Sequence, residues 1–118
     1  MAGERQDGCF VCKVAAKEIP SQIISETGTT LAFKEAGAQA PVHIVVTPKG
    51  HYATAAELAS APDTLAELMR ETGKIAEATG VAKSGYRTLF NTGEDAGQKF
   101  SHAYAVIVGG RPLSGMLG

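Results

Sequence analysis

The chain has 118 residues, of which 44% are hydrophobic and 19% charged, and its formal net charge is −1. This length suffices for one domain with its own core, and the composition is that of a globular protein. The low net charge and the lack of a Lys/Arg cluster argue against a nucleic-acid partner. No apolar run reaches membrane-spanning length and no signal peptide opens the sequence, so we expect a cytoplasmic protein with no membrane partner.

The first predicted element is a short helix. Residues 1–8 are polar and are expected to form a flexible N-terminus, so that the single domain comprises residues 9–118. A helix that begins at Cys9 should end near Glu18, because the residue that precedes Pro20 avoids the helical region.

Three strands should follow this helix. The short runs 23–26 and 29–34 flank a Thr-Gly turn, which predicts an antiparallel hairpin. Residues 43–47 are apolar and β-branched and lie between two prolines, which predicts a buried strand.

The clearest helical pattern lies in the second half of the chain. Apolar and small side chains recur at helical spacing from Leu65 to Thr79, with charged side chains mostly on the opposite face. Asp63 suits the N-cap position, and Gly80 suits the position just after the last helical turn.

Two more strands complete the predicted fold. Residues 86–91 and 100–108 have strand-like patterns, and a Gly-rich loop over residues 92–97 joins them. Hairpins on either side of a long helix predict an α+β fold with a five-stranded antiparallel sheet, one long helix and one short helix.

Several motifs, in order along the chain, resemble those of one family. They are Cys-Phe-Val-Cys-Lys at 9–13, Gln-Ala-Pro-Val-His at 39–43, Pro-Lys-Gly-His at 48–51, the loop 91–98 and the segment 98–111, which ends in Gly-Gly-Arg. Together they resemble the histidine-triad (HIT) superfamily in its bacterial branch, and the Gly-Gly-Arg ending resembles the Hint branch. The resemblance implies a HIT-like fold and a homodimer whose two five-stranded sheets join edge to edge.

The triad that names this family is incomplete here. In the family, three histidines alternate along one strand, and the second attacks an α-phosphorus to form a nucleotidyl-histidine. Only the first, His102, is present; Tyr104 holds the second place and Val106 the third. A phenol is mostly protonated at neutral pH and is therefore a poor nucleophile, and valine neither donates nor accepts. We expect the family's hydrolase or transferase activity to be absent.

The resemblance also implies a ligand site. Glu35 stands where the Hint branch has a ribose-binding aspartate, and Lys99 stands where it has a phosphate-binding serine. Asn91 and Gly97 match the family's binding loop, although turn chemistry explains both residue types equally well, and Lys99 fits a solvated loop lysine as well. The residues expected to line a ligand are Glu35, Asn91, Gly97, Lys99, Tyr104 and Val106.

A second constellation comprises Cys9, Cys12, His51 and His102. A C-x-x-C pair alone suits either a metal or a redox site, but the sequence lacks the βαβ context of a thioredoxin-like motif. Some bacterial family members, and the related galactose-1-phosphate uridylyltransferases, have metal ligands at matching positions. A closed Cys2His2 set is typical of structural zinc. The alternative is two buried thiols and two ordinary histidines.

Three functions remain open. The first is a degenerate family member that binds a nucleotide or a similar small phosphorylated metabolite without hydrolysing it. The second is a repurposed enzyme, for example of specialised metabolism, in which Tyr104 and His43 are the acid–base groups that act on a non-nucleotide small molecule. The third is a zinc-stabilised dimeric interaction module without a ligand. His43 could bond Tyr104 across the sheet or be a satisfied core histidine.

Overall fold

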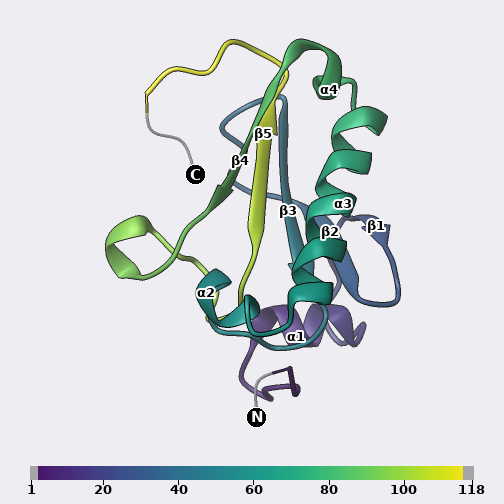
Figure 1. Cartoon of the computed structure of the whole chain (residues 1–118), viewed down its shortest axis with the longest axis vertical. Coiled ribbons are helices and arrows are strands. Elements are labelled where there is room, and N and C mark those ends of the chain that lie inside the picture. The colour runs from purple at the N-terminus through teal and green to yellow at the C-terminus, as the bar shows by residue number, and fades with distance from the viewer. Residues whose placement is uncertain (1–2, 116–118) are drawn as a thin grey trace.

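Five strands form one antiparallel sheet in the computed structural model of the chain, which describes residues 3–115 (Figure 1). They are β1 (Ile23–Glu26), β2 (Thr30–Lys34), β3 (Val42–Pro48), β4 (Tyr86–Phe90) and β5 (Ala105–Gly109). Their order in the sheet is β1-β2-β3-β5-β4, and each neighbouring pair is antiparallel. The predicted α+β fold with a five-stranded antiparallel sheet is confirmed.

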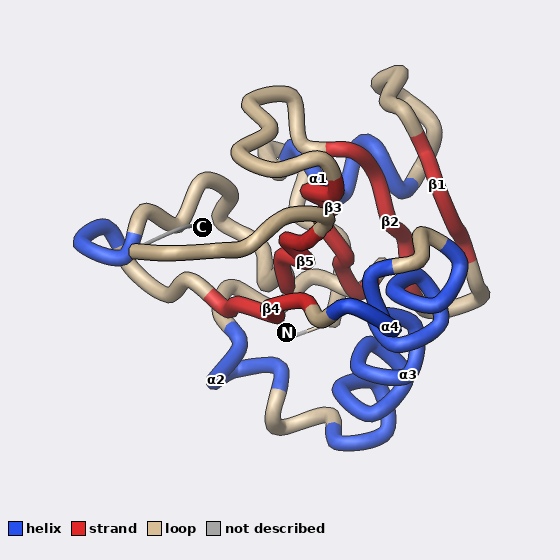
Figure 2. The backbone as a smooth tube through the Cα atoms, turned by 90° about the horizontal axis from the view of Figure 1, so that it is seen from above, coloured by secondary structure: helices blue, strands red, loops and turns tan. Residues whose placement is uncertain are grey.

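Helices lie on both sides of this sheet (Figure 2). The long helix α3 (Pro62–Ala78) covers one face, and the short helix α1 (Phe10–Ala15) lies on the other side. The single-turn helices α2 (Ala55–Leu58) and α4 (Val81–Ser84) flank α3, and a 3-10 turn, η1 (Glu94–Ala96), interrupts the loop between β4 and β5. These short turns were not predicted, because four residues carry barely one helical period. Within residues 3–115, no helix is long and apolar enough to cross a membrane.

The start of α3 differs from the prediction. Ala61 occupies the N-cap position without a side-chain hydrogen bond, and Pro62 follows in the first turn. Proline needs no partner for a backbone N–H and has a helical φ, which favours it at this position. Asp63 therefore lies inside the first turn, and its prediction as the N-cap is wrong. Gly80 has φ +83°, the left-handed conformation expected just beyond a helix end.

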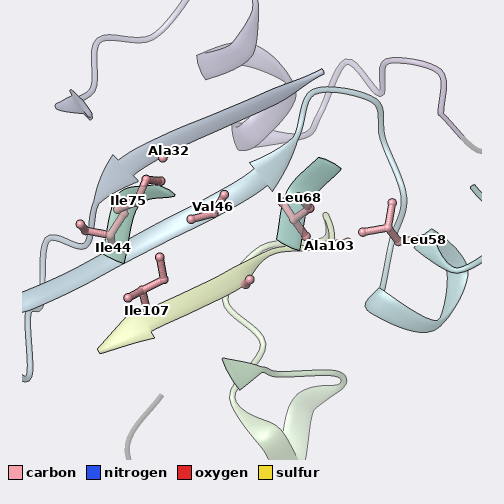
Figure 3. Close-up of a cluster of buried hydrophobic side chains, with 9 residues drawn as sticks. Ala32, Ile44, Val46, Leu58, Leu68, Ile75, Ala103 and Ile107 are labelled. Carbon is pink, nitrogen blue, oxygen red and sulfur yellow. The ribbon is translucent and has the colours of Figure 1, made fainter. Parts of the chain in front are cut away.

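Two apolar clusters pack against the two faces of the sheet. The first lies between the sheet and α3 (Figure 3) and comprises Ala32, Ile44, Val46, Leu58, Leu68, Ile75, Ala103, Ala105 and Ile107. The second lies on the face toward α1 and comprises Val14, Leu31, Phe33, Val45, Tyr104, Val106 and Val108. Alternation along β3 and β5 separates the two sets, as expected for strands buried on both sides.

Strand β5 begins later than predicted. Its ladder covers residues 105–109, whereas a strand over 100–108 was predicted. Before it, the N–H of Ala103 donates to the carbonyl of Tyr52 instead of to a neighbouring strand. Tyr104 and Val106 nevertheless share one face, so the expected two-residue alternation holds across the strand start.

Candidate functional site

Cys9, Cys12, His51 and His102 meet in space, although as many as 93 residues separate them in sequence. Cys9 is the N-cap of α1 and Cys12 lies in its first turn, while the histidines follow β3 and precede β5. Their candidate ligand atoms all lie within 4.8 Å of one another. Both cysteines and His102 are buried.

The separations between these atoms suit one tetrahedral ion. Nδ1 of His102 lies 3.3 Å from Sγ of Cys9 and 3.7 Å from Sγ of Cys12, and Nδ1 of His51 lies 3.5 Å from Sγ of Cys12. Sulfur at about 2.3 Å and nitrogen at about 2.05 Å from a tetrahedral zinc would lie about 3.6 Å apart. The four residues could therefore hold a metal ion.

Hydrogen bonding orients His102 for this role. Its Nε2 lies 2.7 Å from the carbonyl oxygen of Pro48, which can only accept, so Nε2 carries the hydrogen. The lone pair of Nδ1 then points toward the two sulfur atoms. Metal-bound histidines commonly donate their second N–H to a carbonyl in this way. Desolvation lowers the pKa of His102 to about 4, which keeps the ring in the neutral form that binds metals.

The position of the two cysteines in α1 determines the hydrogen bonding and the burial of their sulfur atoms. The N–H of Cys12 donates to Sγ of Cys9 at 3.4 Å, which places the sulfur of Cys9 at the helix N-terminus. Burial is the main cause that raises the pKa of the Cys12 thiol above its ordinary value. A metal ion would have to displace this thiol proton, so affinity should rise with pH.

Tyr104 is enclosed at the second triad position. Only 3% of its surface is exposed, and its ring packs edge-on against that of Phe100, with ring centroids 5.1 Å apart. Its Oη accepts a hydrogen bond of 2.9 Å from the backbone N–H of Lys99. Val106, at the third position, is buried in the same apolar cluster. The second and third triad positions therefore offer one phenol whose oxygen already has a backbone partner, and one valine.

Glu35 and Lys99, which the resemblance assigned to a ligand, pair with each other. Nζ of Lys99 lies 3.0 Å from Oε1 of Glu35, whose side chain is only 9% exposed. Burial alone would raise the pKa of Glu35. The Lys99 ammonium and the N–H of Gly37 outweigh that effect and hold the pKa below its usual range. The carboxylate is therefore ionised at neutral pH.

His43 is buried beside the β2–β3 connection. Its Nδ1 accepts from the N–H of Gln39 at 2.9 Å, so the neutral ring carries its hydrogen on Nε2, which is buried and has no partner in the described part of the chain. Desolvation is the main cause that lowers the pKa of His43. The bond to Tyr104 that the sequence allowed is absent. His43 pairs with Val108, four residues farther along the chain than Tyr104, whose hydroxyl bonds Lys99.

The predicted loop residues lie between β4 and β5. Asn91 directly follows β4 and is half-buried, and Gly97 has φ +78° at the end of η1, a conformation that glycine adopts readily. This conformation accounts for the glycine by turn chemistry. A hollow of about 570 Å³ borders the same loop, and Gly93, Lys99 and Ser101 are among its lining residues.

Gln98 was not among the predicted site residues, yet it organises this loop. Its Nε2 donates to the carbonyls of Ala53 and Phe100 at 2.8 and 2.7 Å, and its Oε1 accepts from the N–H of Gly93 at 2.9 Å. A side-chain amide both donates and accepts, which suits it to joining two loops. The signal in the sequence is an amide placed directly between a Gly-rich loop and a strand.

Known proteins resemble this chain in sequence and in fold. The model of the HIT domain family matches residues 16–113. Protein HitA of Neisseria gonorrhoeae is 39% identical over 106 residues, which cover 87% of this chain and 96% of HitA. A purine nucleoside phosphoramidase of Escherichia coli strain K12 is 35% identical over 106 residues, which cover 89% of each protein.

Comparison with solved structures leads to the same family as the sequence relatives. A histidine triad protein from Clostridium difficile superposes with a TM-score of 0.89 at 32% identity, over 96% of this chain and 99% of that one. The resemblance inferred from the motifs is confirmed, and this chain belongs to the HIT domain family.

Proposed function

We propose that this protein binds a small phosphorylated metabolite, such as a nucleotide, without the family's histidine chemistry. The observation that carries the proposal is the state of Tyr104, which is 3% exposed and accepts the N–H of Lys99. A nucleophile must present a free lone pair to the atom it attacks and needs a base to activate it. Among the described residues, no imidazole bonds the Tyr104 hydroxyl.

The loop between β4 and β5 supports phosphate binding. Its hollow of about 570 Å³ falls within the range of about 300–1,000 Å³ typical of small-molecule sites. The ammonium of Lys99 and the hydroxyl of Ser101 are suitable partners for phosphate oxygens. The relative from Escherichia coli is named a purine nucleoside phosphoramidase, so AMP is a sensible first ligand to test.

Thermal unfolding would test this binding. AMP at 100 times its dissociation constant should stabilise the native state by about 2.7 kcal/mol and raise the melting temperature measurably. Ser101→Ala should reduce the shift, and Ser84→Ala, which removes an exposed hydroxyl elsewhere, should leave it unchanged. No shift with AMP, ADP or inorganic phosphate would refute the proposal.

We further propose that the four-residue cluster binds structural zinc. Two cysteines and two histidines complete a tetrahedral set, which leaves no open position for a substrate. Bound zinc would supply folding free energy rather than chemistry. The two free cysteines fit a reducing compartment, and we propose the cytoplasm.

A homodimer joined through β4 is the third part of the proposal. Strands β1 and β4 are the two edges of the sheet, and both expose apolar side chains. The pairing of β1 is irregular between Ile23 and Ser25, whereas β4 pairs regularly, and an irregular edge disfavours association. Light scattering should give about twice the 12.2 kDa chain mass. Phe90→Lys should yield a monomer and Ile24→Lys should not; the reverse pattern would place the interface at β1.

An acid–base enzyme remains the second candidate, and one observation favours it. The N–H at Nε2 of His43 is buried without a partner in the described residues, and such groups often mark functional sites. Turnover of a non-nucleotide compound that is lost in both Tyr104→Phe and His43→Asn would support this candidate. If neither a ligand nor a turnover is found, the third candidate remains, a zinc-stabilised dimeric interaction module without a ligand.

A further inference from the structure

The arm that precedes α1, residues 3–8, is hydrogen-bonded near both of its ends. Figure 1 shows the arm in dark purple, at the same end of the molecule as α1. At its start, the N–H of Gly3 donates to the carbonyl of His51. Near its end, the carbonyl of Gln6 accepts from the N–H of Cys9 at 3.0 Å. The arm therefore connects the turn that carries His51 with the first turn of α1, which carries the cysteines.

The start of the arm packs closely against residues 50–52. Gly3 has φ +91°, a conformation that glycine adopts readily. A Cβ atom at Gly3 would lie 3.1 Å from Oη of Tyr52, and a Cβ atom at Gly50 would lie 3.0 Å from the carbonyl oxygen of Gly3. The absence of side chains at both glycines is therefore what allows the arm to approach this turn.

Arg5 fastens the middle of the arm. Its guanidinium donates to both carboxylate oxygens of Glu18, which lies just beyond α1, and the bond from Nη2 to Oε1 is 2.6 Å long. Two parallel bonds of this kind fix the orientation of both groups. The side chains of Arg5 and Glu18 are 42% and 47% exposed, so water screens the pair. This fastening is well oriented, yet it can open without any change in the core.

The arm also reaches the sulfur of Cys12. Burial is the main cause that raises the pKa of this thiol, while a hydrogen bond from the backbone N–H of Gln6 and the charge of Arg5 act in the opposite direction. An N–H that is donated to sulfur favours the thiolate, the form that reacts and that binds metals. Only 3% of Cys12 is exposed. The arm is therefore part of what encloses this sulfur.

We propose that the arm is a latch that controls access to the four-residue cluster of cysteines and histidines. In the closed state it holds together the segments before α1 and after β3 and encloses Cys12. Opening breaks the bond of Gly3 and the surface ion pair of Arg5, and leaves the sheet intact. Segments held by few surface bonds open far more often than the whole fold unfolds. The effect of the latch on metal exchange rests on the zinc proposed above, whereas its effect on the thiol does not.

Alkylation of Cys12 by iodoacetamide tests the latch in the full-length, chelator-treated protein, with mass spectrometry to locate the modified cysteine. Arg5→Gln should raise the rate about twofold to fivefold, the range expected for one exposed ion pair. The direction of the change is informative, because loss of the Arg5 charge alone would raise the pKa of Cys12 and slow the reaction. An equal or slower rate in Arg5→Gln would overturn the proposal.

Arg70→Gln is the matched control. Arg70 is an exposed arginine in an ion pair of 3.1 Å with Glu67, within α3 and outside the arm, so its loss should leave the rate for Cys12 unchanged. Glu18→Gln should raise the rate as Arg5→Gln does. The two changes together should be no faster than either alone, because they remove one ion pair. Equal acceleration by Arg70→Gln would show that the arm is not what limits access.

A second variant loosens the other end of the latch. Gly3→Val places a β-branched side chain at a positive φ, against Tyr52, and should release the start of the arm. Combined with Arg5→Gln, it should raise the alkylation rate at least about tenfold, because independent fastenings multiply their effects. Gly28→Val is the control, since a Cβ atom there has nothing within 4 Å and its φ lies outside the left-handed region. A combined variant no faster than Arg5→Gln would contradict a latch fastened at both ends.

Release of zinc to 4-(2-pyridylazo)resorcinol, followed by absorbance, tests the effect of the latch on the metal. Arg5→Gln should raise the release rate by about the same factor as the alkylation rate, because both processes require the same opening. Faster release without faster alkylation would assign Arg5 to metal affinity instead of access and would overturn the latch. Protein that holds no zinc would refute the proposed metal site, and the alkylation rates would still decide the latch.

Discussion

The four-residue cluster of cysteines and histidines and the triad positions meet in one short segment, because His102 belongs to both, yet they have opposite chemical character. His102 turns a lone pair toward two sulfur atoms, with its tautomer set by Pro48. Two and four residues later, Tyr104 and Val106 are buried in an apolar cluster. One short segment thus contributes a candidate metal ligand at one position and side chains packed in an apolar cluster at the next two alternate positions.

The largest expected effect is on catalysis. It tests whether the residues at positions 99, 104 and 106 alone account for the expected loss of the family's activity. The triple change Tyr104→His, Val106→His and Lys99→Ser should restore measurable nucleotidyl-imidazole formation, at least about 100-fold above the wild type, because removal of a nucleophile typically costs orders of magnitude. Tyr104→His alone should recover little. Mass spectrometry of the trapped intermediate provides the readout. An inert but folded triple variant would show that more than these three positions has changed.

The metal cluster should dominate stability. Elemental analysis of protein purified without added metal should give about one zinc per chain. Cys12→Ser should reduce the free energy of unfolding by at least about 3 kcal/mol, because structural metal binding is coupled to folding. Ala16→Ser introduces the same side chain at an exposed position near the end of α1 and should be nearly neutral. Metal-free protein whose melting is unchanged by a chelator would show that the cluster holds no structural metal.

Tyr104→Phe should have a smaller effect on stability. It leaves the ring packing in place but removes the oxygen that accepts the N–H of Lys99. Leaving such a group unsatisfied should cost about 1–3 kcal/mol if the N–H stays dry. Tyr86→Phe removes an exposed hydroxyl on β4 and serves as the control, with an expected change near zero. Equal denaturation midpoints for the two variants would mean that the bond to Lys99 contributes nothing.

The smallest expected effect is the pH dependence of the Glu35–Lys99 pair. The folded pKa of Glu35 lies below its ordinary value of 4.5, so the unfolded chain binds the proton more tightly. The contribution of the pair is therefore complete above that ordinary value and is lost as pH falls through the folded pKa. Glu35→Gln should flatten acid destabilisation in this window by less than about 1 kcal/mol, since the Lys99 side chain is 43% exposed and water screens its charge. If the free energy of unfolding of Glu35→Gln falls with decreasing pH as steeply as that of the wild type, the Glu35–Lys99 pair makes no such contribution.

Local patterns predicted most of the fold. The β-branched run between prolines became β3, and the helical periodicity became α3. The meeting of the two cysteines and two histidines was predictable because these residue types have few uses at such spacings. The prediction of Asp63 as the N-cap was wrong because Pro62 favours a helix start one residue earlier. Both residue types are common at helix starts, and composition does not decide between them.

The contacts that Lys99 makes with Glu35 and Tyr104 were not predictable from local patterns. The pairing of Lys99 with Glu35 depends on how the β4–β5 loop folds back over the end of β2, which is a long-range property of the chain. The bond from Lys99 to Tyr104 depends on where β5 begins, and the carbonyl of Tyr52 shifts that start. Such contacts arise from tertiary geometry rather than from the residue types themselves.

The most direct test of the proposed loss of histidine chemistry is turnover of adenosine 5′-phosphoramidate by the wild-type protein as purified, measured beside Tyr104→Phe. We expect no turnover above background for either protein and no change in the intact mass of the chain. Robust hydrolysis by the wild type that Tyr104→Phe abolishes, together with a nucleotidyl adduct on Tyr104, would contradict it and identify the tyrosine as the nucleophile.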